Sequence, residues 1–94
     1  MTSNDEAQVA YWKGRALLDR RDLTGNRRAA LAEFERAIAA DPTFATAHAG
    51  LAEAQWALYQ ETNDKSLADG ALASTRKAIE LEPDRPGEIG RAHV

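Results

Sequence analysis

Chemically reactive side chains are sparse in this 94-residue sequence, and their spacing matches no catalytic or metal site. The two histidines, His48 and His93, have no partner at His-x-x-x-His or carboxylate–histidine spacing, and His48 is expected to be a packed or half-exposed structural residue. Each Glu-x-Glu pair, such as Glu33 and Glu35, would point to different sides of a helix and is interpreted as solvated surface charge. Gly-rich phosphate loops and a Gly-x-Ser-x-Gly motif do not occur. We therefore expect no catalytic residue, no cofactor and no metal, and an enzyme active site is the least favoured function.

The overall composition indicates a soluble, folded chain. Apolar residues make up 44% and charged residues 29%, which is ordinary for a globular protein. The chain has no cysteine, so disulfides and thiolate metal sites are excluded. Its net charge of −3 argues against nucleic-acid binding, which requires a dense basic surface. The sequence shows neither a secretory signal nor an apolar run of about 18 residues, so we expect no membrane insertion and a cytoplasmic location.

Apolar residues recur at three- and four-residue spacing in four segments, which is the pattern of helices with one buried face. Abundant alanine and scarce valine and isoleucine support the same interpretation, since alanine favours helices and β-branched residues favour strands. The sequence therefore predicts an all-α fold. The side chains predicted to face the core are Val9, Ala10, Ala16, Leu17, Leu18, Ala30, Leu31, Phe34, Ala37, Ile38, Ala47, Leu51, Ala54, Leu58, Leu67, Ala68, Ala71, Leu72, Ala78 and Ile79.

Polar and conformationally special residues indicate where these helices begin and end. Ser3 and Glu6 have the spacing of a capping box, so the first helix is expected to start there. Gly25 can adopt a positive φ in the following turn, and Asn26 suits the N-cap of the second helix. Asn63-Asp64 is the expected exit of the third helix and cap of the fourth. The second, third and fourth helices are expected at residues 27–40, 44–61 and 65–81.

Three glycines, Gly14, Gly50 and Gly70, fall inside these expected helices, where glycine costs about 1 kcal/mol relative to alanine. Gly70 is interpreted as a sign that the fourth helix begins close to it. Gly14 and Gly50 are interpreted as points where a neighbouring backbone comes close.

The two halves of the chain repeat each other. "AIAADP" at residues 37–42 returns as "AIELEP" at residues 78–83, an offset of 41 residues. The match extends backwards, because the Ala-Leu-Ala at residues 30–32 returns at residues 71–73. Small, apolar and acid-proline positions that recur together indicate one structural unit used twice.

At these positions the chain resembles the tetratricopeptide repeat (TPR) family, whose unit of about 34 residues forms two antiparallel helices. Thr75 stands where that family prefers an aromatic residue, and Ala10 and His48 occupy its usual tryptophan position. Both units are longer than the family standard. The residues that match the repeat signature are Gly14, Ala30, Phe34, Ala37, Pro42, Leu51, Ala52, Ala71, Ala78 and Pro83.

The resemblance implies antiparallel helical hairpins stacked as a short right-handed superhelix, a fragment of an α–α solenoid. Its expected parts are an N-terminal cap segment at 1–6, unit 1 at 7–42, unit 2 at 43–83 and a non-repeat tail at 84–94. Residues 88–94, "EIGRAHV", resemble the translation of a sequencing-library adapter. We therefore expect a longer parent protein, and an uncapped last hairpin that could self-associate through Leu72 and Ile79.

The functional implication of the resemblance is a protein–protein interaction scaffold that binds a peptide or partner helix in a concave groove, without catalysis. Tyr11 and Trp56 suit either a binding hot spot or packing between hairpins, and Arg15 could fork onto a carboxylate. The partner-binding positions implied by the resemblance are Gln8, Tyr11, Arg15, Leu18, Asp19, Thr46, Ala49, Glu53, Trp56 and Ala57.

Several alternatives stay open at this point. The lengthened units look like TPR arrays of large bacterial signalling proteins, so the chain could be a regulatory or sensory segment of a signalling enzyme or transcription regulator. A four-helix bundle and a Sel1-like repeat are the rival folds. The arginines of "RRDLTGNRR", residues 20–28, could dock an acidic partner or form a solvated loop.

Overall fold

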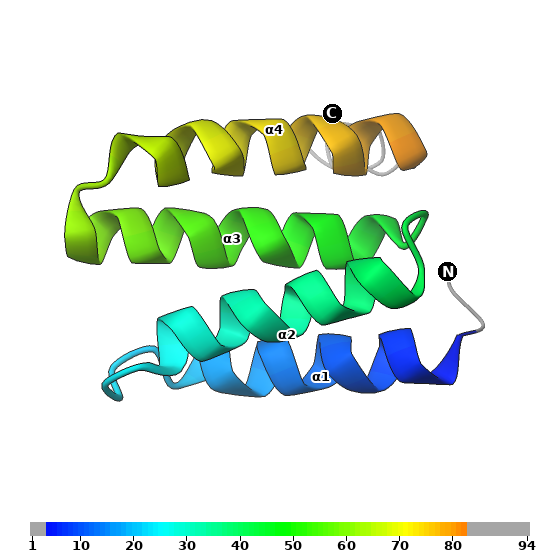
Figure 1. Ribbon diagram of the computed structural model, residues 1–94, viewed down its shortest axis with the longest axis horizontal. Coiled ribbons are helices and arrows are strands. Elements are labelled where there is room, and N and C mark those ends of the chain that lie inside the picture. Colours follow the sequence, from blue (N-terminus) through cyan, green and yellow to red (C-terminus); the bar gives the residue numbers. More distant parts are fainter. Residues whose placement is uncertain (1–3, 83–94) are drawn as a thin grey trace, which may run out of the picture.

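The computed structural model describes residues 4–82, and within this range the chain is all-α, as predicted, with no strand. Consecutive helices run antiparallel and lie side by side in chain order, from α1 at one end of the stack to α4 at the other (Figure 1). They form two hairpins, α1–α2 and α3–α4. The helices are α1 (Asp5–Asp19), α2 (Asn26–Ala40), α3 (Ala45–Thr62) and α4 (Lys65–Leu81).

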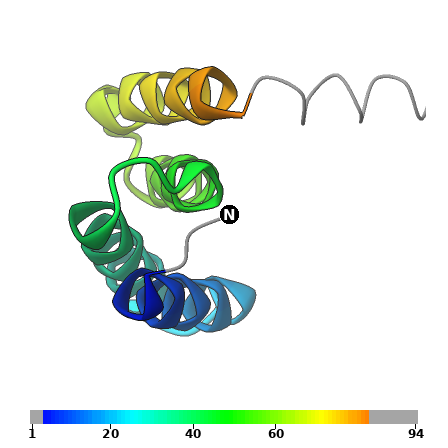
Figure 2. The same cartoon turned by 90° about the vertical axis from the view of Figure 1, so that its right-hand side faces the viewer.

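The hairpins are joined because α3 packs on α2 and also touches α1. Seen end-on, the four helices follow a curved path rather than the square of a compact bundle (Figure 2). Two apolar clusters fill the contacts between α1, α2 and α3. The first consists of Ala7, Ala10, Ala37, Phe44 and Ala47, and the second of Leu18, Ala30, Phe34, Ala54 and Ala57.

Asn4 caps α1. The Asn4 side-chain oxygen accepts a hydrogen bond from the backbone N–H of Ala7 at 3.0 Å, as an N-cap residue does. Its amide nitrogen also donates to the carbonyl oxygen of Ala40 at 3.0 Å. Asn4 thus both caps α1 and ties it to the end of α2, whereas the capping-box contacts expected of Ser3 lie outside the described residues.

The turn between α1 and α2 also differs from expectation at one residue. Gly25 adopts the predicted positive φ, 84°, and is itself the N-cap of α2. Asn26, the predicted cap, is the first residue of the helix, and its side-chain amide donates to the carbonyl oxygen of Arg20 at 2.9 Å. The Asn26 side chain thus holds the preceding turn closed rather than capping the helix.

The turn between α3 and α4 follows the prediction. Asn63 adopts a left-handed conformation at the end of α3, with φ at 61°. Asp64 is the N-cap of α4, and its carboxylate accepts from the backbone N–H of Ser66 at 3.0 Å. Both residues do what their side-chain chemistry favours at helix ends.

The ring of Phe34 on α2 lies against a glycine of each neighbouring helix, Gly14 of α1 and Gly50 of α3. A Cβ atom on Gly14 would lie 2.7 Å from this ring, and one on Gly50 would lie 2.5 Å from it. The predicted close approach at both glycines is therefore made by an aromatic side chain and not by a neighbouring backbone. Phe34 is fully buried between them.

Gly70 lies within α4, so the expectation that the helix begins there was wrong. A Cβ atom at this position would lie 2.7 Å from the side-chain nitrogen of Gln55 on α3. The Gln55 oxygen accepts a hydrogen bond from the Ser74 hydroxyl at 2.8 Å. Gly70 leaves room for this polar contact between α3 and α4.

Most of the side chains predicted to be in the core are buried or half-buried, but several on the two outermost helices are not. Val9 and Ala16 of α1 and Leu72 and Ile79 of α4 are exposed. The reason is that α1 and α4 have a neighbouring helix on one side only within the part of the chain described.

Every helix in this range is also too short or too polar to span a lipid bilayer.

Candidate partner-binding surface

Two of the groove positions, Arg15 on α1 and Glu53 on α3, are joined by an ion pair. The Arg15 guanidinium donates to one Glu53 oxygen at 2.9 Å, and Arg21 donates to the other at 3.2 Å. Asp19 lies 3.9 Å from the Arg15 guanidinium. Partial burial acts to lower the pKa of Arg15, but the hydrogen bond to Glu53 and the Glu53 charge outweigh this, and the pKa is raised.

This ion pair changes the role expected for Arg15. The sequence suggested that Arg15 could bind a carboxylate of a partner, whereas Glu53 of the same chain already supplies that carboxylate. Arg21 was not among the predicted groove residues, because nothing in the sequence shows that the end of α1 reaches α3. The three side chains brace α1 against α3.

Tyr11 packs between the hairpins. Its ring centroid lies 5.7 Å from that of Phe34 and 5.5 Å from that of Phe44, and Trp12 makes an edge contact with it at 5.2 Å. For Tyr11, the packing alternative of the sequence analysis is therefore the one observed.

Other groove positions fall in different surroundings. Leu18 and Ala57 are fully buried in the second cluster, so their assignment to the partner-binding surface is corrected. Leu18 turns inward because α2 and α3 cover that side of α1, and Ala57 lies on the side of α3 that packs there. Gln8 and Thr46 are half-buried, and Asp19 and Ala49 are exposed.

An open hollow of about 600 Å³ lies between α3 and α4. Three of the predicted partner-binding positions line it: Ala49, Glu53 and Trp56. Trp56 is 49% exposed at this hollow, and its ring centroid lies 5.2 Å from that of Tyr59. The floor is built mainly from alanine side chains. The hollow is lined by Ala49, Ala52, Glu53 and Trp56 of α3 and by Ala68, Ala71, Leu72 and Thr75 of α4.

The α4 side of this hollow was not predicted as a binding surface. The signal was present in the sequence, because Thr75 occupies the repeat position that holds Phe34 in the first unit. Phe34 fills the space between its neighbours, whereas Thr75 is too short to fill the corresponding space. The departure from the repeat pattern thus coincides with the hollow.

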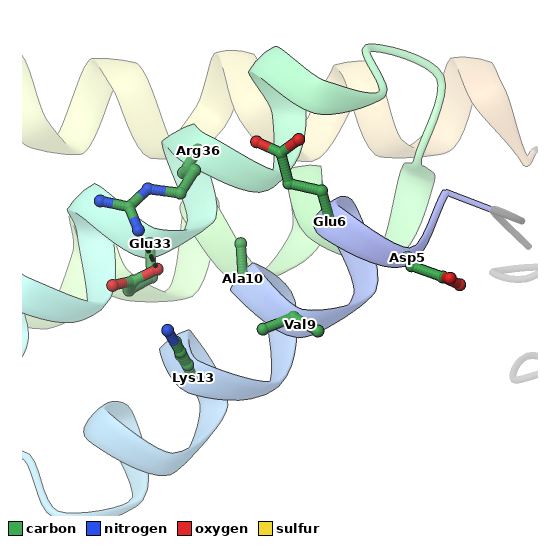
Figure 3. Close-up of a pocket in the computed structure, with 7 residues that line it drawn as sticks. All are labelled: Asp5, Glu6, Val9, Ala10, Lys13, Glu33 and Arg36. Carbon is green, nitrogen blue, oxygen red and sulfur yellow. Dashed lines mark ion pairs between the residues drawn. The ribbon is translucent and has the colours of Figure 1, made fainter.

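A second, smaller hollow of about 320 Å³ lies between α1 and α2 at the other end of the stack (Figure 3). Its lining is mostly charged, and Glu33 and Arg36 form an ion pair across 3.6 Å within it. Val9 and Lys13 lie on its α1 side. Both signs of charge occur on this lining, so it is not a site of one sign, although the Glu33 oxygen nearest Arg36 has no hydrogen-bond partner within the described residues.

The arginines at the tip of the first hairpin mostly brace the fold. Arg20 forms an ion pair with Asp22 at 3.1 Å. Arg27 donates to the carbonyl oxygen of Ala57 at 2.8 Å, which links α2 to α3. With Arg21 bound to Glu53, these contacts favour an internal role over the docking of an acidic partner.

His48 is a packed residue, as predicted. It is buried, and its Nε2 atom lies 2.9 Å from the carbonyl oxygen of Pro42, which joins α3 to the preceding turn. Asp41 stabilises the same turn by accepting from the backbone N–H of Thr43 at 3.1 Å.

Among residues 4–82, no group of three or more His, Cys, Asp or Glu side chains could hold a metal ion. The predictions for Ser3, Pro83, His93 and the tail at 84–94 lie outside the described residues.

No protein-family model, curated protein or solved structure matches this chain. The TPR resemblance and its functional implications therefore stay predictions.

Proposed function

We propose that this chain is a TPR-like interaction module that binds the apolar face of a helical segment in the hollow between α3 and α4, without chemistry of its own. The observation that carries the proposal is the exposed indole of Trp56 beside an alanine-floored hollow of about 600 Å³. Tryptophan is enriched among the residues that dominate binding energy at protein interfaces.

The shape and lining of the hollow favour a helix as the ligand. Small side chains in its lining leave space for a large apolar side chain of the ligand, as Gly14 and Gly50 leave space for the ring of Phe34. Trp56 and Leu72 stand at its two sides and supply apolar contact area. An amphipathic helix with one or two large apolar side chains complements such a groove.

The charged rim contributes little to this binding. Glu53 is the only charged side chain lining the hollow within the described residues, and both of its oxygens already bind arginines of the same chain. We therefore expect affinity to depend on the apolar face of the ligand and only weakly on ionic strength.

The experiment selects helical peptides against the whole chain from a display library and measures their affinity by calorimetry. Trp56→Ala should weaken binding by about 30-fold, which corresponds to a hot-spot loss of about 2 kcal/mol. Leu23→Ala is the matched control, because Leu23 is also an exposed apolar residue but lies in the α1–α2 turn. A folded Trp56→Ala variant with unchanged affinity, or a library that yields no helical ligand, would show that the hollow is not the site.

A further inference from the structure

In this structure one helix, α3, packs across the α1–α2 hairpin, and we call the hairpin surface that it covers the first seat. Helix α3 covers the side of the α1–α2 hairpin formed by Leu18, Leu31 and Phe34, and Ile38 packs beside it. On α3 itself, three residues one turn apart make these contacts. They are Ala47, Gly50 and Ala54.

The second hairpin has an equivalent surface, which we call the second seat. The offset of 41 residues places Leu72, Thr75 and Ile79 of α4 where α2 has Leu31, Phe34 and Ile38. Leu31 is half-buried against the second apolar cluster, whereas Leu72 is 58% exposed. No helix within residues 4–82 occupies the second seat.

The first helices of the two hairpins correspond at an offset of 38 residues, and their burial supports this register. Gly14 and Ala52 are equivalent, and so are Leu18 and Trp56. The buried residues that match are Ala7, Ala10 and Gly14 in α1 and Ala45, His48 and Ala52 in α3.

The second seat requires a different occupant from the first. In the first seat Phe34 fills the space, and α3 meets it with Gly50 because no Cβ fits there. In the second seat Thr75 is short and leaves the hollow. The occupant must therefore bring a large apolar side chain at the position that Gly50 has in α3.

Helix α1 has such a side chain at that position. The register of 38 residues places Trp12 at the position of Gly50, with Val9 at Ala47 and Ala16 at Ala54. All of this face of α1 is exposed, and Trp12 is 65% exposed. It lies at the opposite end of the stack from α4 (Figure 1).

We propose that this chain self-associates head to tail, with the Val9–Trp12–Ala16 face of α1 in one copy seated in the α3–α4 hollow of the next. The indole of Trp12 enters the space beside Thr75. In the first hairpin a large residue, Phe34, meets a small one on the covering helix, Gly50; in the proposed contact the small residue is Thr75 and the covering helix brings the large one, Trp12. The proposal rests on the proposed function, because it names a second copy as the helical partner of the same hollow.

A head-to-tail contact uses two different surfaces, so in a pair one copy keeps its hollow and the other keeps its α1 face free for a further copy. Association then continues beyond the dimer, as a ring or an open chain. A symmetric contact between two α4 faces through Leu72 and Ile79 would stop at a dimer. This difference makes the proposal testable without knowledge of any other partner.

The experiment is sedimentation velocity on the whole chain from micromolar to millimolar concentration. The unmodified chain should exceed the mass of a dimer as concentration rises, and Trp12→Asp and Leu72→Asp should each be monomeric. An equimolar mixture of these two variants should form a dimer and nothing larger, since each retains the surface that the other has lost. Leu23→Asp, an exposed apolar position away from both surfaces, should associate like the unmodified chain.

A variant that introduces no charge tests the hollow itself. Thr75→Phe places a ring where Trp12 is proposed to enter and should weaken self-association at least about tenfold. Circular dichroism establishes that each variant is folded. Unchanged association of folded Thr75→Phe would overturn the assignment of the hollow.

The other outcomes each decide the question. An unmodified chain that is monomeric at millimolar concentration overturns self-association, and Trp12→Asp that still dimerises shows a symmetric contact instead. If the monomeric chain still binds selected helical peptides through Trp56, this inference fails while the proposed function stands. If neither a second copy nor a peptide binds, both fail.

Discussion

Phe34 and the two glycines around it show how much of this fold depends on single atoms. The ring occupies the space that a Cβ on either Gly14 or Gly50 would need, so α1 and α3 can approach α2 only as glycine-bearing helices. Interiors are packed densely enough that one added methyl group is felt. The cost of glycine within a helix is thus offset by close packing around one buried aromatic ring.

Gly50→Ala should therefore lower the free energy of unfolding by about 1–2 kcal/mol, since overpacking outweighs the helix propensity that alanine adds. Gly70→Ala is the matched control, because its Cβ would meet only the end of the flexible Gln55 side chain. Urea unfolding of both variants measures the difference. Equal stability of Gly50→Ala and the unmodified chain would contradict the packing described.

At the scale of elements, the hairpins are held by polar contacts at their ends as well as by apolar faces. Asn4 caps α1 and reaches Ala40 at the end of α2, while Arg15 and Arg21 hold α3 through Glu53. Exposed ion pairs contribute little, typically below about 1 kcal/mol each. A cap that also joins two helices contributes more per side chain.

Asn4→Ala should lower the free energy of unfolding by about 1 kcal/mol or somewhat more, because it removes the cap and the bond to Ala40. Asn4→Asp separates the two effects, since the carboxylate still accepts from Ala7 but cannot donate to Ala40. Thermal unfolding should rank the unmodified chain above Asn4→Asp and Asn4→Asp above Asn4→Ala. An alanine variant as stable as the unmodified chain would exclude a stabilising cap.

The cap of α4 should make stability depend on pH. Hydrogen bonds from Ser66 lower the pKa of Asp64 in the folded chain. The unfolded pKa is about 3.9, so the stabilisation is fully present above that pH and is lost as the pH falls through the lower folded pKa. Asp64→Asn, which caps without titrating, should make the melting temperature depend less on pH below about pH 4. Identical acid profiles for the two proteins would contradict this account.

At the scale of the whole molecule, the described helices form a stack with two unlike apolar ends. Trp12 and Val9 are exposed at the α1 end, and Leu72 and Ile79 are exposed at the α4 end. Contiguous exposed apolar surface commonly marks an interaction site, whereas singly exposed apolar side chains are ordinary. The unlike ends favour binding of helices, including those of another copy.

If copies associate head to tail, the melting temperature should rise with protein concentration, because only the folded chain has the complementary surfaces. Scanning calorimetry at two concentrations a hundredfold apart, on the order of 10 µM and 1 mM, measures the shift. Trp12→Asp should melt at the same temperature at both concentrations. A concentration-dependent melting temperature in that variant would place the contact elsewhere.

The sequence by itself determined the elements. The helix ranges, the positive φ of Gly25, the cap at Asp64 and the packed role of His48 follow from local spacing and side-chain chemistry, which act within a few residues. The repeat of Ala-Ile and acid-proline also indicates two similar hairpins through its spacing alone. These properties depend on neighbours along the chain, and they could be predicted for that reason.

The tertiary structure alone decided which surfaces these elements leave exposed. Leu18 turned out to be buried and Val9 exposed, although both lie on α1 and both are apolar, because only one side of α1 has a neighbour. Arg15 was bound by Glu53 from a helix that is distant in sequence. The hollow beside Trp56 exists because no helix within residues 4–82 covers Thr75 as α3 covers Phe34. Burial, pairing and empty space depend on how helices pack against one another, which the spacing of residues within one helix does not contain.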